Sequence, residues 1–288
     1  MPQQIQTILL RDTPILSTAL ELEASTARIE VQCLLQHILS VPRVYLFTHP
    51  ERSLSAVELA QYEALLLRRL GGEPIAYILG EREFFGLNFK VTPATLIPRP
   101  DTELLVELAL QRIPVREPST VLDMGTGSGA IALAIAHACP LAFVTACDAS
   151  AAALGVAQEN ALALGLSKVN FVQSDWFTAL EAQKFSLIVS NPPYIAAGDT
   201  HLTQGDVRFE PVSALVSGAD GLSDIRHIIS HAVAYLHEGG WLLLEHGYDQ
   251  AVAVRELLQR AAYTEVFSAC DLAGIERVSG GRLPSYLL

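Results

Sequence analysis

The sequence predicts an α/β fold in which a small helical bundle precedes a doubly wound, Rossmann-like sheet. Residues 1 to about 80 show helical periodicity and few strand signals. From residue 97 onward, short apolar strand-like runs alternate with Ala- and Leu-rich helical stretches, which is typical of parallel strands joined by crossover helices. A Gly-rich turn at 125–129 joins one of these strands to a helix.

The first 96 residues predict a helical bundle and a short hairpin. Gly71-Gly72 ends the last helical run, and EFFGLNFKV at 83–91 alternates around a glycine. We therefore expect a helical domain at 1–80, a hairpin linker at 81–96 and a larger domain at 97–288. The apolar positions at helical spacing are Ile29, Cys33, Leu34, Leu59, Tyr62, Leu65, Leu66 and Leu70.

The residue pattern of the larger domain predicts five strands. Helices are expected at 129–138 and 150–164, and a third within GLSDIRHIISHAVAYLHEGG. The order of these elements favours a parallel sheet with helices on both faces. The expected strands are 119–124, 142–147, 168–173, 185–190 and 240–245.

Composition limits the classes of partner. The chain of 288 residues has 19 basic and 31 acidic residues, and its net charge of -12 disfavours nonspecific binding to nucleic acid or to anionic membranes. Its four cysteines form no C-x-x-C pair, so neither a zinc knuckle nor a disulfide framework is expected. The apolar N-terminal stretch ends at Arg11-Asp12, too short for a signal or a membrane span. We expect a soluble, monomeric cytoplasmic protein.

The strongest local signal is VLDMGTGSGAIALAIA at 121–136. Glycines let the backbone approach a ligand closely, and the following helix offers unpaired N–H groups. A cofactor is expected here, although a purely structural loop is the alternative. The turn also satisfies a loose dinucleotide fingerprint, so it does not separate NAD from S-adenosylmethionine. The residues expected at this site are Asp123, Gly125, Thr126, Gly127, Ser128 and Gly129.

Polar residues follow the next strands as well. Asp148 can accept hydrogen bonds from two ribose hydroxyls, and Asp175-Trp176 offers an acceptor for an adenine amino group beside a flat ring. Either aspartate could instead cap a helix. Together, three successive strand ends would line one elongated nucleoside ligand.

The fourth strand ends in Asn191-Pro192-Pro193-Tyr194. Prolines hold a carbonyl in a fixed direction without supplying a competing donor, whereas a bare turn could be built from Gly, Asp or Ser. A dinucleotide enzyme gives no reason for a carboxamide there. A methyl donor bound along the first three strands would present its sulfonium methyl near this position.

These motifs resemble the amino-methylating, seven-stranded S-adenosylmethionine-dependent methyltransferases. Two further segments resemble the HemK/PrmC family of peptide chain release factor glutamine N5-methyltransferases, and this resemblance covers essentially the whole chain. It implies S-adenosylmethionine as cofactor and class 1 release factors as protein substrates, with the glutamine of their Gly-Gly-Gln loop in the cleft. It also implies that the domain at 1–80 recognises the substrate and that the domain at 97–288 is the methyltransferase catalytic domain. The two segments are Ile97-Pro98-Arg99-Pro100-Asp101-Thr102-Glu103 and Gly205-Asp206-Val207-Arg208-Phe209-Glu210-Pro211.

The resemblance also implies roles for the motif residues. The Asn191 side-chain oxygen and the Pro192 carbonyl would each accept one N–H of the substrate amide, and Tyr194 would pack on its plane. Transfer would then depend mainly on proximity and orientation, worth roughly 7 to 11 kcal/mol in favourable geometry. Asn191 would also lie beside the cofactor. No metal and no catalytic base are expected.

Several alternatives stay open. The chain could methylate an amino group of adenine or cytosine, act as an NAD-dependent oxidoreductase, or serve as a noncatalytic adaptor on the same fold. Arg99 could contact the cofactor carboxylate or stabilise the domain junction, and Glu210 could close the substrate pocket or cap a loop. His227 and His231 have metal-like i, i+4 spacing, but without a third ligand they favour a solvated helix face.

Overall fold

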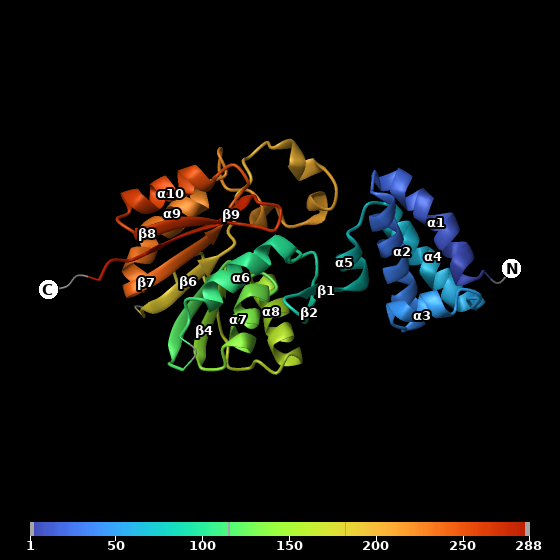
Figure 1. The fold of residues 1–288 in the computed structure, drawn as a ribbon, viewed down its shortest axis with the longest axis horizontal. Coiled ribbons are helices and arrows are strands. Elements are labelled where there is room, and N and C mark those ends of the chain that lie inside the picture. Colours follow the sequence, from blue (N-terminus) through green and yellow to red (C-terminus); the bar gives the residue numbers. More distant parts are fainter. Residues whose placement is uncertain (1–2, 115, 182, 286–288) are drawn as a thin grey trace. The chain divides into compact units, whose positions relative to one another are not determined.

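The structure, a computed structural model, describes residues 3–114, 116–181 and 183–285 (Figure 1). The chain forms two compact units. The helical unit comprises Met1–Gly80 together with Thr203–Phe209, and the sheet unit comprises Glu81–Leu202 with Glu210–Leu288. A short segment that follows the Asn-Pro-Pro-Tyr motif therefore belongs with the N-terminal helices.

The helical unit is built from amphipathic helices around an apolar core, as the periodicity predicts. One of its helices begins at a clear local signal: α4 starts with a capping box in which Ser55 and Glu58 bond to each other's backbone N–H. Tyr62 of α4 is buried, and its hydroxyl donates to Asp12 at 2.8 Å. The helices are α1 (Ile5–Leu20), α2 (Ala24–Leu39), α3 (Arg43–Thr48), α4 (Ala56–Leu70) and α5 (Ile75–Leu79).

Ion pairs of the buried Arg69 side chain connect α4 with α2 and with the segment Thr203–Phe209. The Arg69 side chain is only 3% exposed, and its Nε lies 2.7 Å from Glu30 Oε2. Its Nη1 lies 3.1 Å from Asp206 Oδ1, in the segment Thr203–Phe209. A buried guanidinium needs such partners because its desolvation is costly.

We predict that Arg69→Met lowers the free energy of unfolding of the helical unit by about 3–5 kcal/mol, because it leaves the Glu30 carboxylate buried without its partner. Arg68→Met is the matched control, since Arg68 pairs with Glu73 at the surface and its loss should cost no more than about 1 kcal/mol. Hydrogen exchange of α2 and α4 amides measures both. Equal protection in the two variants would contradict a stabilising role for the buried pair.

The sheet unit contains a seven-stranded sheet with the order β5-β4-β3-β6-β7-β9-β8. The first five strands in that order are parallel, and β9 runs antiparallel to both of its neighbours, β7 and β8, which confirms the expected α/β fold class. A separate hairpin, β1 (Glu81–Phe84) and β2 (Leu87–Lys90), overlaps the hairpin signal at 83–91. The sheet strands are β3 (Ser119–Met124), β4 (Ala142–Asp148), β5 (Asn170–Gln173), β6 (Phe185–Ser190), β7 (Leu236–Glu245), β8 (Thr264–Cys270) and β9 (Glu276–Arg282).

The predicted strands at 119–124 and 185–190 coincide with β3 and β6. The strand predicted at 240–245 is longer, and β8 and β9 were not predicted from pattern. Glycine is depleted in strands, yet β9 contains Gly280, where an added Cβ would lie 2.6 Å from a Leu243 methyl. Close packing against β7 therefore requires Gly280. The same glycine lowers the strand propensity of β9, so the sequence pattern did not predict this strand.

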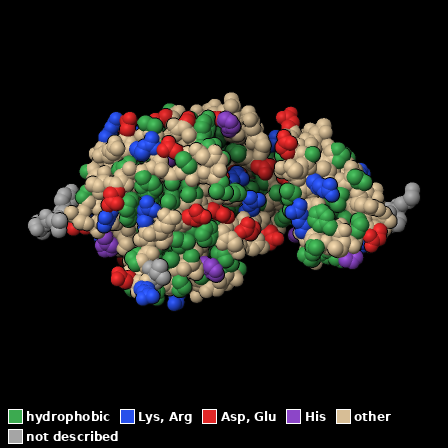
Figure 2. Space-filling view, viewed as in Figure 1, with side chains coloured by type: hydrophobic (Ala, Val, Ile, Leu, Met, Phe, Trp, Pro, Cys, Tyr) green, Lys and Arg blue, Asp and Glu red, His purple; other side chains and the backbone are tan. Residues whose placement is uncertain are grey.

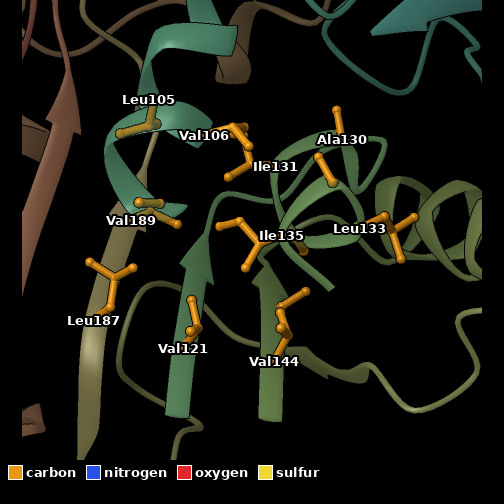
Figure 3. Packing of buried hydrophobic residues seen from close by; sticks show 14 of the residues in the cluster. Leu105, Val106, Val121, Ala130, Ile131, Leu133, Ile135, Val144, Leu187 and Val189 are labelled. Carbon is orange, nitrogen blue, oxygen red and sulfur yellow. The ribbon is translucent and has the colours of Figure 1, made fainter. Parts of the chain in front are cut away.

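Helices cover both faces of the sheet (Figure 1). On one face, Val121, Leu187 and Val189 pack with residues of α6 and α7, as Figure 3 shows. On the other, alternate residues such as Leu122 and Ile188 pack with α9 and α10. This alternation follows from the two-residue period of a strand. The helices are α6 (Glu103–Leu110), α7 (Ala130–Ala138), α8 (Ala151–Ala163), α9 (Ser223–Tyr235) and α10 (Ala251–Arg260).

Short 3-10 turns η1 (Pro100–Thr102), η2 (Thr200–Thr203), η3 (Val207–Phe209) and η4 (Val212–Ala214) complete the described elements. Within the described ranges, no helix has the length and apolar character needed to cross a membrane. On the face drawn in Figure 2, Lys and Arg side chains are scattered among Asp and Glu.

Candidate active site

The Gly-rich turn lies between β3 and α7. Gly125, Gly127 and Gly129 have φ angles of 69°, 56° and 84°, which favour glycine. A Cβ on Gly129 would lie 3.0 Å from the Leu133 side chain and 3.1 Å from the Ala157 Cβ, so a larger residue would push the turn away from α7 and α8. The helix predicted at 129–138 begins at Ala130, with Gly129 as its N-cap.

The buried Asp123 side chain stabilises this turn by accepting hydrogen bonds. Its carboxylate is fully buried, and Oδ2 accepts hydrogen bonds from Thr126 Oγ1 at 2.6 Å and from the Ala132 N–H at 3.1 Å. Burial raises the pKa of Asp123 to about 7. Ser128 is also buried, and its carbonyl accepts from Asn160 Nδ2 at 2.9 Å. Asp123 and Ser128 therefore shape the backbone that a ligand would meet.

Asp148 stands at the end of β4, beside the turn. Its Oδ2 accepts from the Gly127 N–H and its Oδ1 from the Ser150 N–H, both at 2.9 Å. The N-cap of α8 is Ser150, so Asp148 is not the helix cap. Each carboxylate oxygen keeps a further lone pair, and the two oxygens can accept from neighbouring hydroxyls.

Asp175 and Trp176 follow β5. Asp175 is exposed, and Trp176 is partly buried. Carbon atoms of the Trp176 ring lie 3.7 and 3.8 Å from where a Gly125 Cβ would be, so the ring lies beside the Gly-rich turn. Its Nε1 donates to Asp224 Oδ1 at 3.1 Å, which fixes the ring plane.

Asn191-Pro192-Pro193-Tyr194 follows β6 directly. Because Met124 of β3 pairs in register with both Cys147 of β4 and Ser190 of β6, the ends of these strands share one edge of the sheet. Asn191 Nδ2 donates to Thr102 Oγ1 at 3.2 Å. Within the part of the chain that the structure describes, neither Asn191 Oδ1 nor the Pro192 carbonyl accepts a hydrogen bond. Two acceptors are thus available at this edge.

Hydrogen bonds hold both the side-chain hydroxyl and the backbone carbonyl of Tyr194. Its hydroxyl donates to Glu245 Oε1 at 3.4 Å, and its carbonyl accepts from Gln250 Nε2 at 3.0 Å. Burial, reinforced by Glu245, raises the pKa of Tyr194, so the phenol stays neutral. The residues that hold Tyr194 come from the end of β7 and the loop before α10.

Arg99 and Glu210 form an ion pair with each other. The Glu210 side chain is buried, and its Oε2 also accepts from the Ile97 N–H at 3.2 Å. Glu210 thereby connects the segments that precede η1 and η4. His227 and His231 stack on each other with ring centroids 4.1 Å apart. Among the described residues, no group of three or more His, Cys, Asp or Glu side chains could hold a metal ion.

Sequence reasoning missed four residues that support the site: Thr102, Asp224, Glu245 and Gln250. Glu245 carried a usable signal, because it is an acid at the end of the apolar strand WLLLE. Thr102 lies in the segment that carried the family resemblance, but nothing in its local sequence indicates that it contacts Asn191.

We predict that Gly221→Ala sharply lowers activity, because a Cβ there would lie 2.3 Å from the Tyr194 carbonyl oxygen and 2.7 Å from Gln250 Nε2. The backbone carrying Tyr194 would have to move. Gly274→Ala is the matched control: its φ of 80° resembles the 74° of Gly221, but no atom lies within 4 Å of its added Cβ. Steady-state kinetics measures both variants, and equal activities would contradict the clash.

Comparison with known proteins gives two family matches. Residues 101–209 match the methyltransferase small domain, and residues 17–80 match the PrmC N-terminal domain. The chain is 52% identical over 255 residues to a release factor glutamine methyltransferase of Vibrio cholerae, covering 88% of this chain and 89% of that one. A protein of the same name from Xylella fastidiosa is 51% identical over 268 residues, covering 92% and 98%.

Solved structures share the fold at low identity. A methyltransferase from Pyrococcus furiosus superposes with a TM-score of 0.54 at 19% identity, covering 76% of this chain and 98% of that one. A 16S rRNA methyltransferase from T. thermophilus, in complex with AdoMet and guanosine, gives a TM-score of 0.52 at 23% identity, covering 70% and 49%. These likenesses establish the fold alone.

Proposed function

The chain belongs to the release factor glutamine methyltransferase family, and from this premise we propose that it methylates the side-chain amide nitrogen, N5, of a release factor glutamine. The proposed acceptor is the glutamine of the Gly-Gly-Gln motif in class 1 release factors. The observation that carries the proposal is the pair of unengaged acceptors, Asn191 Oδ1 and the Pro192 carbonyl, at the sheet edge beside the Gly-rich turn.

The strand ends fit S-adenosylmethionine as the methyl donor. The turn at Gly125–Gly129 has no side chain to block a close approach at its glycines, and Asp148 can accept two vicinal hydroxyls. The Trp176 ring offers a flat surface beside the turn, and the exposed Asp175 offers an acceptor. When bound, the cofactor supplies an electrophilic methyl group on its sulfonium.

The substrate amide needs positioning because its nitrogen lone pair is delocalised into the carbonyl. Asn191 Oδ1 and the Pro192 carbonyl would each accept one of its N–H groups and so aim the nitrogen. Pro193 keeps this backbone rigid, and Tyr194 would pack on the amide plane. Correct orientation can contribute roughly 7 to 11 kcal/mol, and proton loss can follow methyl transfer.

The other readings have less support. A flipped base could present its amino group to the same two acceptors, but the curated relatives that match most of this chain are named for release factors. An NAD-dependent reading gives Asn191 and Pro192 no role. We also propose that the chain acts as a monomer in the cytoplasm and that it binds no nucleic acid directly.

The test is transfer of a labelled methyl group from S-adenosylmethionine to unmethylated release factor. A release factor whose motif glutamine is replaced by alanine and a DNA sample are run in parallel. We expect label only in the release factor with its glutamine. Label in DNA alone would favour the nucleic-acid reading, and no label in any sample would favour the adaptor.

A further inference from the structure

The Gln250 carboxamide connects three loops of the sheet unit. Its Nε2 donates to the Tyr194 carbonyl at 3.0 Å and to the Gly221 carbonyl at 3.4 Å, and its Oε1 accepts from the Gly247 N–H at 2.8 Å. Carbonyl oxygens only accept and a backbone N–H only donates, so these partners permit one orientation of the amide. The side chain thereby joins the end of the Asn-Pro-Pro-Tyr motif to the loop before α9 and to the turn after β7.

Two glycines give this carboxamide its space. A Cβ on Gly221 would lie 2.7 Å from Gln250 Nε2, and a Cβ on Gly247 would lie 3.1 Å from Gln250 Oε1. The backbone can therefore approach the amide closely from both sides. Gln250 is also buried, and the loss of a hydrogen bond costs more in a buried site than at the surface.

His246 holds the other side of Gly247. Its Nδ1 lies 2.9 Å from the Gly247 carbonyl oxygen, which also accepts from the Gln250 backbone N–H at 3.1 Å. Since a carbonyl oxygen cannot donate, Nδ1 must bear the proton of this contact. The His246 ring is fully buried, and burial lowers its pKa, which favours the neutral form. In a neutral ring with a proton on Nδ1, the other nitrogen, Nε2, is an acceptor.

The antiparallel strands supply the donor for this acceptor. Ser279 Oγ of β9 lies 2.8 Å from His246 Nε2 and 2.7 Å from Ser268 Oγ of β8. Because Ser279 has one hydroxyl proton and gives it to the ring, Ser268 donates to Ser279 and accepts from Arg255 Nη1 at 2.5 Å. A guanidinium only donates, so the hydrogen bonds run in one direction, from Arg255 to the Gly247 carbonyl. They fix the His246 ring in one tautomer.

We propose that Gln250 and His246 are positioning residues for methyl transfer. Gln250 fixes the Tyr194 carbonyl, and His246 fixes the backbone turn that Gln250 binds. This inference rests on the proposed function, in which Tyr194 packs on the substrate amide. Because prolines make the preceding segment rigid, a shift of the Tyr194 backbone would move its ring together with the motif carbonyl that accepts from the substrate. Neither positioning residue touches the reacting atoms.

The first test is Gln250→Glu, which keeps the shape of the side chain but cannot donate to the Tyr194 carbonyl as a carboxylate. Gln250 is the N-cap of α10, where a negative charge favours the helix, so the variant should fold. We expect kcat to fall about ten- to hundred-fold with little change in the KM of S-adenosylmethionine. Gln259→Glu, at an exposed position of α10, is the matched control and should keep the normal kcat. A normal kcat in Gln250→Glu, or an equal loss in the control, would overturn the proposal.

The second test separates the two ring nitrogens of His246. The side-chain nitrogen of His246→Asn can take the place of Nδ1, whereas that of His246→Gln reaches the place of Nε2. We therefore expect His246→Asn to keep kcat within about three-fold and His246→Gln to lower it about ten-fold. The reverse order, or equal rates, would overturn the role of His246.

A third readout needs no substrate. Nitrogen-15 spectra of the unchanged chain at neutral pH should show a proton on His246 Nδ1 and none on Nε2. A proton on Nε2 would overturn the direction of the hydrogen bonds and with it the proposal. If a His246 variant does not fold, these spectra decide the role of the ring. Failure of the unchanged chain to methylate release factor, with the spectra as expected, would instead refute the proposed function.

Discussion

Asn191→Ala is expected to lower kcat for methyl transfer by about a hundred-fold or more, because it removes one of the two acceptors that we propose to aim the substrate nitrogen. Removal of one preorganised group at a reacting centre typically has an effect of this size. The affinity for S-adenosylmethionine should change much less, since the turn and Asp148 remain in place.

Single-turnover kinetics and calorimetric titration of the cofactor measure these two quantities separately. Asn170→Ala is the matched control, since it alters an exposed asparagine of β5. A variant at Asn191 that keeps normal kcat would contradict the proposed role of its side-chain oxygen as an acceptor for the substrate amide. Loss of cofactor binding in step with kcat would assign Asn191 to the cofactor rather than to the substrate.

Asp148→Ala is expected to weaken S-adenosylmethionine binding by about ten- to hundred-fold. The variant removes the proposed acceptor for the ribose hydroxyls. It also leaves the Gly127 and Ser150 N–H groups without their partner, so the turn loses a support. Both effects act on the cofactor before chemistry begins.

Calorimetric titration of the cofactor measures this change directly. Glu256→Ala removes the same charge from an exposed ion pair on α10 and controls for the altered net charge. Unchanged affinity in Asp148→Ala would show that the carboxylate serves only the protein backbone.

The local pattern predicted much of the sheet unit. β3, the Gly-rich turn and α7 follow one another within a few residues, so periodicity and glycine spacing reveal them. β9 was not predicted because its Gly280 allows close packing against β7 but lowers strand propensity. The predicted domain boundaries and ligand contacts remain predictions.

Contacts between distant residues could not be predicted in the same way. Thr102 and Asn191 are separated by 89 residues, and Arg69 and Asp206 by 137. A single sequence has no periodic signal for such pairs, since only the fold brings them together. For the same reason the grouping of Thr203–Phe209 with the N-terminal helices was not foreseen.

The central claim is that the chain methylates a glutamine amide nitrogen. Tandem mass spectrometry of unmethylated release factor, after incubation with the chain and S-adenosylmethionine, tests it most directly. We predict one added methyl group, located on the side-chain amide of the Gly-Gly-Gln glutamine. A methyl group on another residue, or an unmodified glutamine after complete incubation, would contradict the account.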